Sequence, residues 1–240
     1  MRHLIVSDIH SNLAAFEAVL ADAGSVDRVW SLGDVVGYGP DPNECLERLR
    51  GLPHLSVAGN HDWGSIARID ISDFNPEAQH ICRWTGQQLS ADNQAYLAGL
   101  AETVVEGDFT IVHGSPRYPT WEYLVYTLSA LENFDYFDTR FCLVGHSHVP
   151  IIFQSRDGTC DLLVPTPDSV WHLGEQRLII NPGAVGQPRD GDERASYVIL
   201  DTDQDTLTYR RVPYPVYVTQ KRMQQAGLPE RQISRLAMGW

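Results

Sequence analysis

The sequence predicts an α/β fold whose two halves form a sandwich of β-sheets. Short apolar runs recur along the chain, and each stops at a glycine, a serine or another polar residue, as a buried strand does where it meets a loop. Between residues 1 and 49 such runs alternate with helical patterns, which is typical of βαβ units and a parallel sheet. The C-terminal half instead has paired apolar runs joined by turn residues, which indicates β-hairpins.

In the N-terminal part, strands are expected at the apolar runs that begin near Leu4, Val29 and Leu55. A helix is expected over residues 13–20, because the apolar residues of this segment recur at helical spacing. Asn12 directly precedes the segment, and we interpret it as the N-cap of the helix.

The stretch 63–100 lacks strong strand character, and helices are expected over 76–89 and 91–100. Asn75 followed by Pro76 is a typical helix start.

Residues 118–138 form an aromatic-rich, partly helical insertion, for which two interpretations stay open. Either the rings build a pocket wall that stacks on a nucleobase, or they cover the core. The helical spacing of Trp121, Leu124 and Leu128 favours the second interpretation.

The C-terminal half is expected to be mainly β-structure, with strands at 109–112, 141–144, 151–154 and after the Arg156-Asp157-Gly158 turn, and with a hairpin of 196–200 and 206–212. A last helix is expected over 216–226, ending at Gly227. Residues 232–240 are expected to be loosely ordered or docked on a neighbour.

Composition is consistent with one domain spanning residues 1–240, with 43% hydrophobic residues to fill a core. No apolar stretch approaches the roughly 20 residues that a membrane span needs. Residues 1–3 lead directly into the first strand, so no signal peptide is expected. The four cysteines lack CxxC spacing and fit reduced thiols, which predicts a cytoplasmic protein.

The formal net charge of −13 makes a nucleic acid polymer an unlikely partner, because no basic stripe is present to displace counterions. A small phosphorylated substrate remains compatible with this charge. Two divalent ions would add about four positive charges at one place and reverse the local field.

Five of the apolar runs end in residues of the types that bind metals. Because ligands bind at the carboxyl ends of strands in open α/β sheets, these side chains are expected at one sheet edge. They are Asp8, His10, Asp34, Asn60, His61, His113, His146 and His148. Nitrogen and oxygen donors without a thiolate suit Mn, Fe, Co or Zn rather than Ca. Seven ligands, namely four imidazoles, two carboxylates and one amide oxygen, fit two metals that share a carboxylate, an arrangement used in phosphoester hydrolysis.

The ordered blocks carry a resemblance to a known family. They read Asp8-Ile9-His10, Gly33-Asp34-Val35-Val36-Gly37, Gly59-Asn60-His61-Asp62, the lone His113 and Gly145-His146-Ser147-His148. This set resembles the calcineurin-like metallophosphoesterase superfamily. The stretch Asn181-Pro182-Gly183 resembles its small bacterial and archaeal phosphodiesterase branch. The resemblance covers residues 1 to about 201, most of the chain.

The resemblance implies a four-layer α/β/β/α sandwich of two mixed sheets flanked by helices. It also implies two divalent metal ions (Mn, Fe or Zn) and assigns a role to each site residue. One metal would be bound by Asp8, His10 and His148, and the second by Asn60, His113 and His146, with Asp34 bridging both. His61 would be a proton donor or would stabilise the transition state.

The reaction that the resemblance implies is hydrolysis of a phosphomonoester or phosphodiester by in-line attack of a metal-bridging hydroxide. A nucleotide or dinucleoside polyphosphate is one candidate substrate. The alternative function is a metal-binding scaffold for a partner protein, but the ligand set is complete, which favours catalysis. The sequence leaves the substrate, the native metal and the oligomeric state open.

Two arginines are candidate clamps for a substrate phosphate, because Arg117 follows the His113 loop and Arg189 follows the Asn181-Pro182-Gly183 stretch. A surface salt bridge is the competing explanation for each of them.

Overall fold

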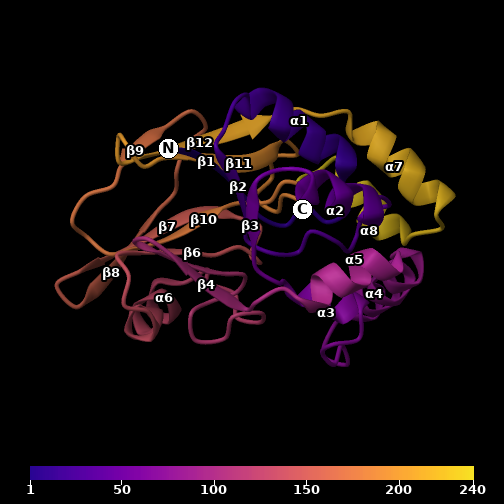
Figure 1. Ribbon diagram of the computed structural model, residues 1–240, viewed down its shortest axis with the longest axis horizontal. Helices are drawn as coiled ribbons and strands as arrows, with labels where there is room; N and C mark the ends of the chain where they lie inside the picture. The colour runs from indigo at the N-terminus through magenta and orange to yellow at the C-terminus, as the bar shows by residue number, and fades with distance from the viewer.

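The computed structural model describes residues 1–240 as two mixed sheets of six strands each, flanked by helices (Figure 1). The four-layer arrangement expected from the family resemblance is therefore confirmed. No helix of the structure combines the length and the apolar character that crossing a bilayer would require.

The first sheet combines a parallel N-terminal part with an antiparallel C-terminal part. Its strands, in spatial order, are β3 (His54–Ser56), β2 (Arg28–Ser31), β1 (Arg2–Val6), β11 (Ala195–Asp201), β12 (Thr206–Val212) and β9 (Val170–His172). The β1–β2 and β2–β3 pairs are parallel, whereas β11 and β12 pair antiparallel. The crossovers between the parallel strands contain α1 (Leu13–Ala23) and α2 (Pro42–Arg50).

The second sheet is also mixed. Its strands, in spatial order, are β4 (Thr103–Glu106), β5 (Phe109–Val112), β6 (Phe141–Leu143), β10 (Leu178–Pro182), β7 (Pro150–Arg156) and β8 (Thr159–Leu163). The three central strands β5, β6 and β10 run parallel, so their carboxyl ends meet at one edge.

The remaining helices border the sheets on the outside. They are α3 (Asn60–Ser65), α4 (Pro76–Gln88), α5 (Ala91–Ala98), α6 (Thr127–Asn133) with a following 3-10 turn (Phe134–Tyr136), α7 (Val216–Gln225) and α8 (Glu230–Arg235). In Figure 1, α3, α4 and α5 form one group, whereas α7 and α8 lie on the side of α1.

Strand β1 shows why the layers pack as they do. Successive side chains of a strand point to opposite faces. Leu4 and Val6 accordingly pack with Phe16 and Val19 of α1, whereas Ile5 belongs to the core between the two sheets. The strand is apolar on both faces because both faces are covered.

Most elements that periodicity predicts are confirmed. β5 and β12 have the predicted bounds, and α4 and α5 end within two residues of their predicted ends. The expected N-cap is also present, because the Asn12 side chain accepts a hydrogen bond from the Ala15 amide. The structure adds β4, β9 and α3, and it makes the Asn181-Pro182-Gly183 stretch the end of strand β10.

Two predictions about irregular segments are wrong. Residues 232–240 are not loosely ordered but dock on their own chain, because Ile233 of α8 and Leu236 just after it pack with Tyr38 and Met223. In the aromatic insertion the helical spacing from Trp121 to Leu128 does not correspond to one helix, because the helix begins only at Thr127.

The apolar side chains of that insertion divide into two groups. Leu124, Phe134 and Phe137 are buried, as expected of residues that cover the core. Trp121 and Leu128 are 40% and 68% exposed, so the helical spacing does not mark one buried face.

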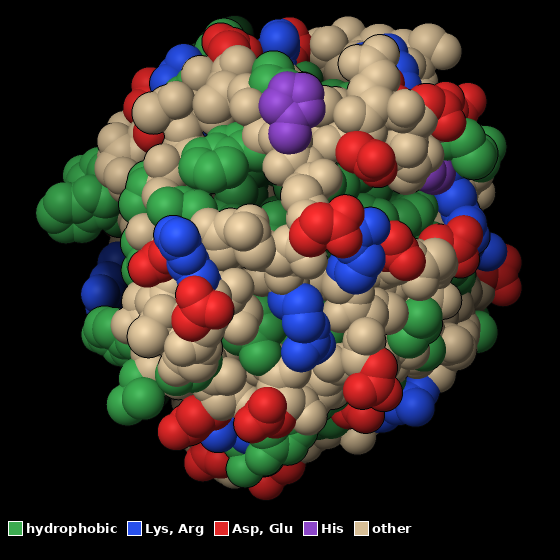
Figure 2. All heavy atoms as spheres, turned by 90° about the vertical axis from the view of Figure 1, so that its left-hand side faces the viewer, with side chains coloured by type: hydrophobic (Ala, Val, Ile, Leu, Met, Phe, Trp, Pro, Cys, Tyr) green, Lys and Arg blue, Asp and Glu red, His purple; other side chains and the backbone are tan.

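All four cysteines are free, as expected, so no disulfide links the chain. A cavity of about 410 Å³ opens between the sheets at the amino ends of their strands, and Trp30, Phe109 and Phe141 contribute to its lining. Figure 2 faces this end of the molecule and shows recessed apolar side chains bordered by charged groups. The predicted metal ligands are not part of this cavity and gather at the carboxyl ends of the strands.

Candidate metal centre

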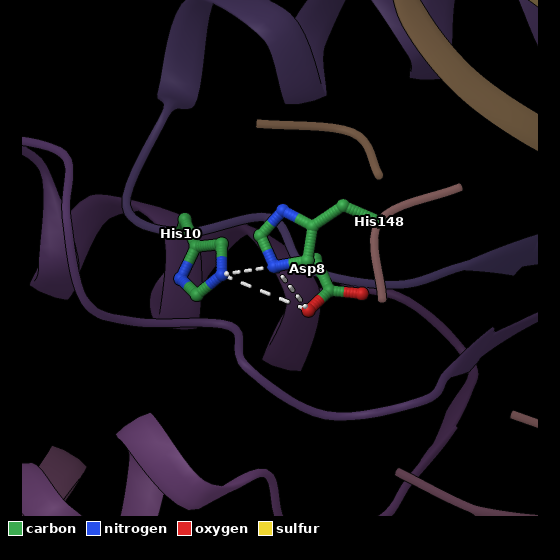
Figure 3. A group of neighbouring side chains, drawn as sticks. All are labelled: Asp8, His10 and His148. Carbon is green, nitrogen blue, oxygen red and sulfur yellow. Dashed lines mark hydrogen bonds and ion pairs between the residues drawn. The ribbon is translucent and has the colours of Figure 1, made fainter. Parts of the chain in front are cut away.

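Three predicted ligands meet at the carboxyl end of β1, as Figure 3 shows. The Nε2 atom of His148 lies 3.1 Å from Asp8 Oδ1, and the Nε2 atom of His10 lies 3.6 Å from the same oxygen. The two Nε2 atoms are 3.2 Å apart. All three side chains are buried, so their donor atoms face a small shared space.

A second group lies beside the first. It contains Asp34, His113 and His146, with His113 Nε2 lying 3.1 Å from His146 Nδ1. Asn60 joins the group, because its Oδ1 is 3.2 Å from His113 Nε2.

Asp34 lies between the two groups. Its Oδ2 is 3.7 Å from His10 Nε2 in the first group and 3.3 Å from His113 Nε2 in the second. The structure thus brings together all seven side chains that the sequence predicts as ligands.

The two carboxylates have the hydrogen bonding expected of metal ligands. Asp8 Oδ2 accepts bonds from Ser7 Oγ at 2.6 Å and the His146 amide at 3.1 Å, and Asp34 Oδ1 accepts one from the His61 amide at 2.8 Å. The other oxygen of each carboxylate, Asp8 Oδ1 and Asp34 Oδ2, is buried without a hydrogen-bond donor. Because a buried anionic oxygen without a partner is costly, these two atoms fit a bound cation.

Backbone carbonyls orient three of the imidazoles. The Nδ1 atoms of His10, His113 and His148 lie 3.1, 2.8 and 2.6 Å from the carbonyl oxygens of Val36, Leu32 and Gln187. A carbonyl only accepts, so each Nδ1 carries a proton, and Nε2 presents its lone pair to the centre whenever the ring is neutral. This is the outer-shell arrangement of histidines that bind metals.

The local backbone is unusual at the ligands themselves. Five of them have a positive φ, in the range 49° to 63°, which residues with a side chain rarely adopt: Asp8, His10, Asp34, His146 and His148. Each stands just beyond a strand, where the left-handed conformation turns the chain at the sheet edge. Gly59 allows its backbone to approach Asp34 closely, since a Cβ atom there would lie 2.0 Å from Asp34 Oδ1.

Charge interactions keep both carboxylates ionised. Burial alone would raise the pKa of Asp8, but the imidazoles of His148, His113 and His10 together hold that pKa below its usual range. For Asp34 the same balance, with His113 as the main partner, holds the pKa well below its usual range. Burial lowers the pKa of His10 and of His146, so both imidazoles are neutral, as a metal requires.

His61 lies beside the ligand groups rather than within them. Its Nδ1 is 3.5 Å from Cys82 Sγ, and its ring is 4.5 Å from Tyr38 and 5.1 Å from both His10 and Phe74, measured between ring centroids. Burial is the main cause that lowers its pKa to about 4.

One side chain of the centre escaped the sequence reasoning, and another was only one of several aromatic candidates for the pocket wall. Asp62 joins two loops, because its carboxylate accepts bonds from the Val36 and Gly59 amides, both at 3.0 Å. Its place at the third position of α3 was the available signal, since an acidic residue there can accept from the amide of the N-cap residue, here Gly59. Tyr123 stacks on His146 with 3.8 Å between ring centroids, and no sequence pattern singled it out from its aromatic neighbours.

The two candidate clamps have different surroundings. Arg117 forms ion pairs with Glu122 and, at 2.7 Å, with Glu132, which favours the salt-bridge explanation. Arg189 donates to Gln187 Oε1 at 2.9 Å, and its guanidinium lies 5.7 Å from the centroid of the Tyr38 ring. A substrate role stays a prediction for both.

Comparisons with known proteins agree with this geometry. The model of the calcineurin-like phosphoesterase superfamily domain matches residues 1–205. An uncharacterised protein of Methanocaldococcus jannaschii is 37% identical over 242 residues, which cover 98% of this chain and 97% of that protein. The symmetrical bis(5'-nucleosyl)-tetraphosphatase of Pseudomonas putida is 35% identical over 78 residues, only 27% of either protein.

Among solved structures, the crystal structure of a metallophosphoesterase from Sphaerobacter thermophilus is similar over the whole chain. The two are 50% identical and superimpose with a TM-score of 0.92, covering 100% of this chain and 99% of the other. The chain therefore belongs to the calcineurin-like phosphoesterase superfamily.

Proposed function

We propose that the protein is a binuclear metal-dependent phosphoesterase that hydrolyses a small phosphomonoester or phosphodiester. One observation carries the proposal. Seven nitrogen and oxygen donors converge on a buried space, and the two carboxylate oxygens that face it, Asp8 Oδ1 and Asp34 Oδ2, have no hydrogen-bond donor. Four free cysteines fit a reducing compartment, so we place the activity in the cytoplasm.

In this proposal Asp8, His10 and His148 hold one divalent ion. Asn60, His113 and His146 hold the other, and Asp34 contacts both. Bound there, the two ions would supply a nucleophilic oxygen at neutral pH and neutralise charge on the phosphoryl group.

The protein's own groups contribute orientation and proton transfer. The carbonyls of Leu32, Val36 and Gln187 hold the imidazoles with Nε2 toward the centre. His61 is buried next to the ligands without belonging to either metal triad, so we assign it to stabilise the transition state or, where bound phosphate raises its pKa, to protonate the leaving oxygen.

A nucleotide is a reasonable candidate substrate. The local similarity to a bis(5'-nucleosyl)-tetraphosphatase supports it, as do two half-exposed rings near the centre. Tyr123 stacks on His146, and Trp121 packs edge-on against Phe74, whose ring is next to His61. A base could stack on such rings with a gain of about 1–3 kcal/mol.

The test combines metal analysis with a substrate panel. Protein purified without chelator should bind more than one Mn ion per chain and should hydrolyse at least one of an aryl phosphomonoester, an aryl phosphodiester and a dinucleoside polyphosphate. Asp34→Asn should reduce both metal content and rate. The matched control, His80→Gln, alters an exposed histidine of α4 and should change neither.

A stoichiometry fixed at one ion with excess Mn would refute the binuclear site. Two bound ions without hydrolysis of any member of the panel would instead favour the scaffold alternative.

A further inference from the structure

The C-terminal helices lie beyond residue 205, where the family match ends, yet α8 is connected to the metal centre. The link is Gln187. Its carbonyl oxygen is the partner of His148 Nδ1 at 2.6 Å, and its side chain donates to Gln232 Oε1 of α8 at 3.2 Å. Gln232 is buried and donates to Glu77 of α4 at 2.6 Å, so α8 is held in one position beside the centre.

This connection links two arginines through the side chains of Gln187 and Gln232. Arg189 donates to Gln187 Oε1, and Arg235 of α8 donates to Gln232 Oε1 at 3.2 Å. Tyr38 separates the pair from the metal ligands, since its ring contacts the Arg189 guanidinium and lies 4.7 Å from the ring of His10.

Neither arginine has an Asp or Glu partner. The Arg189 Nε atom is buried without an acceptor, and the other bond of Arg235 goes to a main-chain oxygen of Trp240, the last residue. Glu77, the nearby acid, accepts its bond from Gln232 instead. Burial and the charge of Arg189 lower the pKa of Arg235 to about 10, as expected of two half-buried like charges.

Such a pair costs free energy unless an anion lies between or beside the two guanidiniums. The arginine fork is the side chain best suited to hold phosphate oxygens. The positive charge of Arg189 also acts on the centre. Burial is the main cause that lowers the pKa of His148 and of His61, and the charge of Arg189 lowers both further.

We propose that Arg189 and Arg235 form a second-phosphate site that selects substrates with a further phosphate beyond the scissile one. The substrate class is then a phosphoanhydride or polyphosphate ester rather than an ester with a single phosphate. The inference rests on the proposed function, and it makes α8 a specificity element built on the family domain.

The experiment measures binding without turnover. Methylenediphosphonate, which has two phosphonyl groups and cannot be hydrolysed, and methylphosphonate, which has one, are titrated into the Mn-loaded protein by calorimetry. Arg235→Gln should weaken binding of the diphosphonate about tenfold, the value of one hydrogen bond to a charged group, and leave methylphosphonate binding unchanged. Arg235→Lys keeps the charge and should recover most of the loss.

The control is Lys221→Gln, which removes the same charge from an exposed position of α7 and should affect neither probe. Equal effects of Arg235→Gln on both probes, or no effect on either, would overturn the proposal. The lysine variant separates charge from structure, because a loss caused by disturbed packing of α8 would persist in Arg235→Lys. Failure of the protein to hydrolyse any phosphoester would refute the proposed function and would not alter this binding comparison.

Discussion

At the scale of single residues, the two oxygens of each carboxylate have different roles in the centre. One oxygen of Asp8 and one of Asp34 accept hydrogen bonds from the protein, and the other faces the ligand nitrogens. Because Asp34 Oδ2 lies within 3.7 Å of ligand nitrogens from both groups, it is the atom on which the proposed binuclear arrangement depends.

Asp34→Asn should therefore weaken both metal sites, whereas His10→Ala should mainly weaken one. The amide keeps the shape of the side chain but removes the negative charge that two cations would share. Metal content after dialysis against a series of Mn concentrations measures this difference. Loss of only one ion from Asp34→Asn would contradict the bridging role.

His61→Gln should retain both metals and lower kcat by about 10²–10⁴, the usual contribution of a positioned proton donor. The reason is the place of its ring beside the ligand groups. Rate and metal content must be measured on the same preparation. Loss of metal from this variant would make His61 a ligand instead of a proton donor.

At the scale of elements, Asn12 ties the first helix to two distant segments. Its Oδ1 caps α1 at the Ala15 amide and accepts from Thr219 of α7, and its Nδ2 donates to the Gly186 carbonyl and to Tyr214. One buried side chain thus joins the N-terminal and C-terminal parts of the fold.

Asn12→Ala should lower the free energy of unfolding by about 2–4 kcal/mol, because a cap is lost and buried partners are left unsatisfied. The matched control is Asn75→Ala, which removes only the cap of α4 at the Ala78 amide and should cost about 1 kcal/mol. Urea denaturation of both variants measures the difference. Equal losses would mean that the additional bonds of Asn12 contribute nothing.

Sequence periodicity predicted the elements with a strong one-sided pattern and missed those formed by tertiary context. Strand β5 was predicted with its observed bounds because four consecutive apolar or β-branched residues are buried there. Strand β9 is three residues long and exposed on both outer positions, so its sequence has no buried run to detect. Helix α3 is only six residues long and begins inside the ligand block, which hid it.

The candidate site was predicted at the level of residue types, because ordered motifs identify ligands without geometry. The hydrogen bonds that orient the ligands and connect α8 to the centre could not be predicted, because they join residues that are distant along the chain. The partner of His148 Nδ1 is 39 residues away, and Arg235 reaches the centre only through Gln232 and Gln187. The extent of the domain, residues 1–240, stays a prediction.

At the scale of the whole molecule, the centre lies where both sheets end. Asp8, His10 and Asp34 come from loops that follow strands of the first sheet, and His113 and His146 from loops that follow strands of the second. Ions held there would cross-link the two central layers of the sandwich.

Metal removal should therefore lower the melting temperature. Saturation at a hundred times Kd stabilises a protein by about 2.7 kcal/mol, which corresponds to about 5–10 °C for a chain of this length. Thermal denaturation with Mn and with a chelator measures the shift. The double variant Asp8→Asn with Asp34→Asn serves as the control and should show none; an equal shift in that variant would mean that Mn acts elsewhere.

The left-handed backbone at five ligands affects whether these ligands are retained during evolution. A residue with a side chain pays about 1–2 kcal/mol for this conformation and glycine does not. Glycine at position 34 should thus be at least as stable as alanine there, whereas Ala15→Gly inside α1 should cost about 1 kcal/mol. Denaturation of Asp34→Gly, Asp34→Ala and Ala15→Gly compares them, and a glycine penalty of the helical size at position 34 would contradict the argument. Backbone stability alone would favour glycine at all five positions, so selection for a stable fold would erode this ligand set wherever selection for its chemistry ceased.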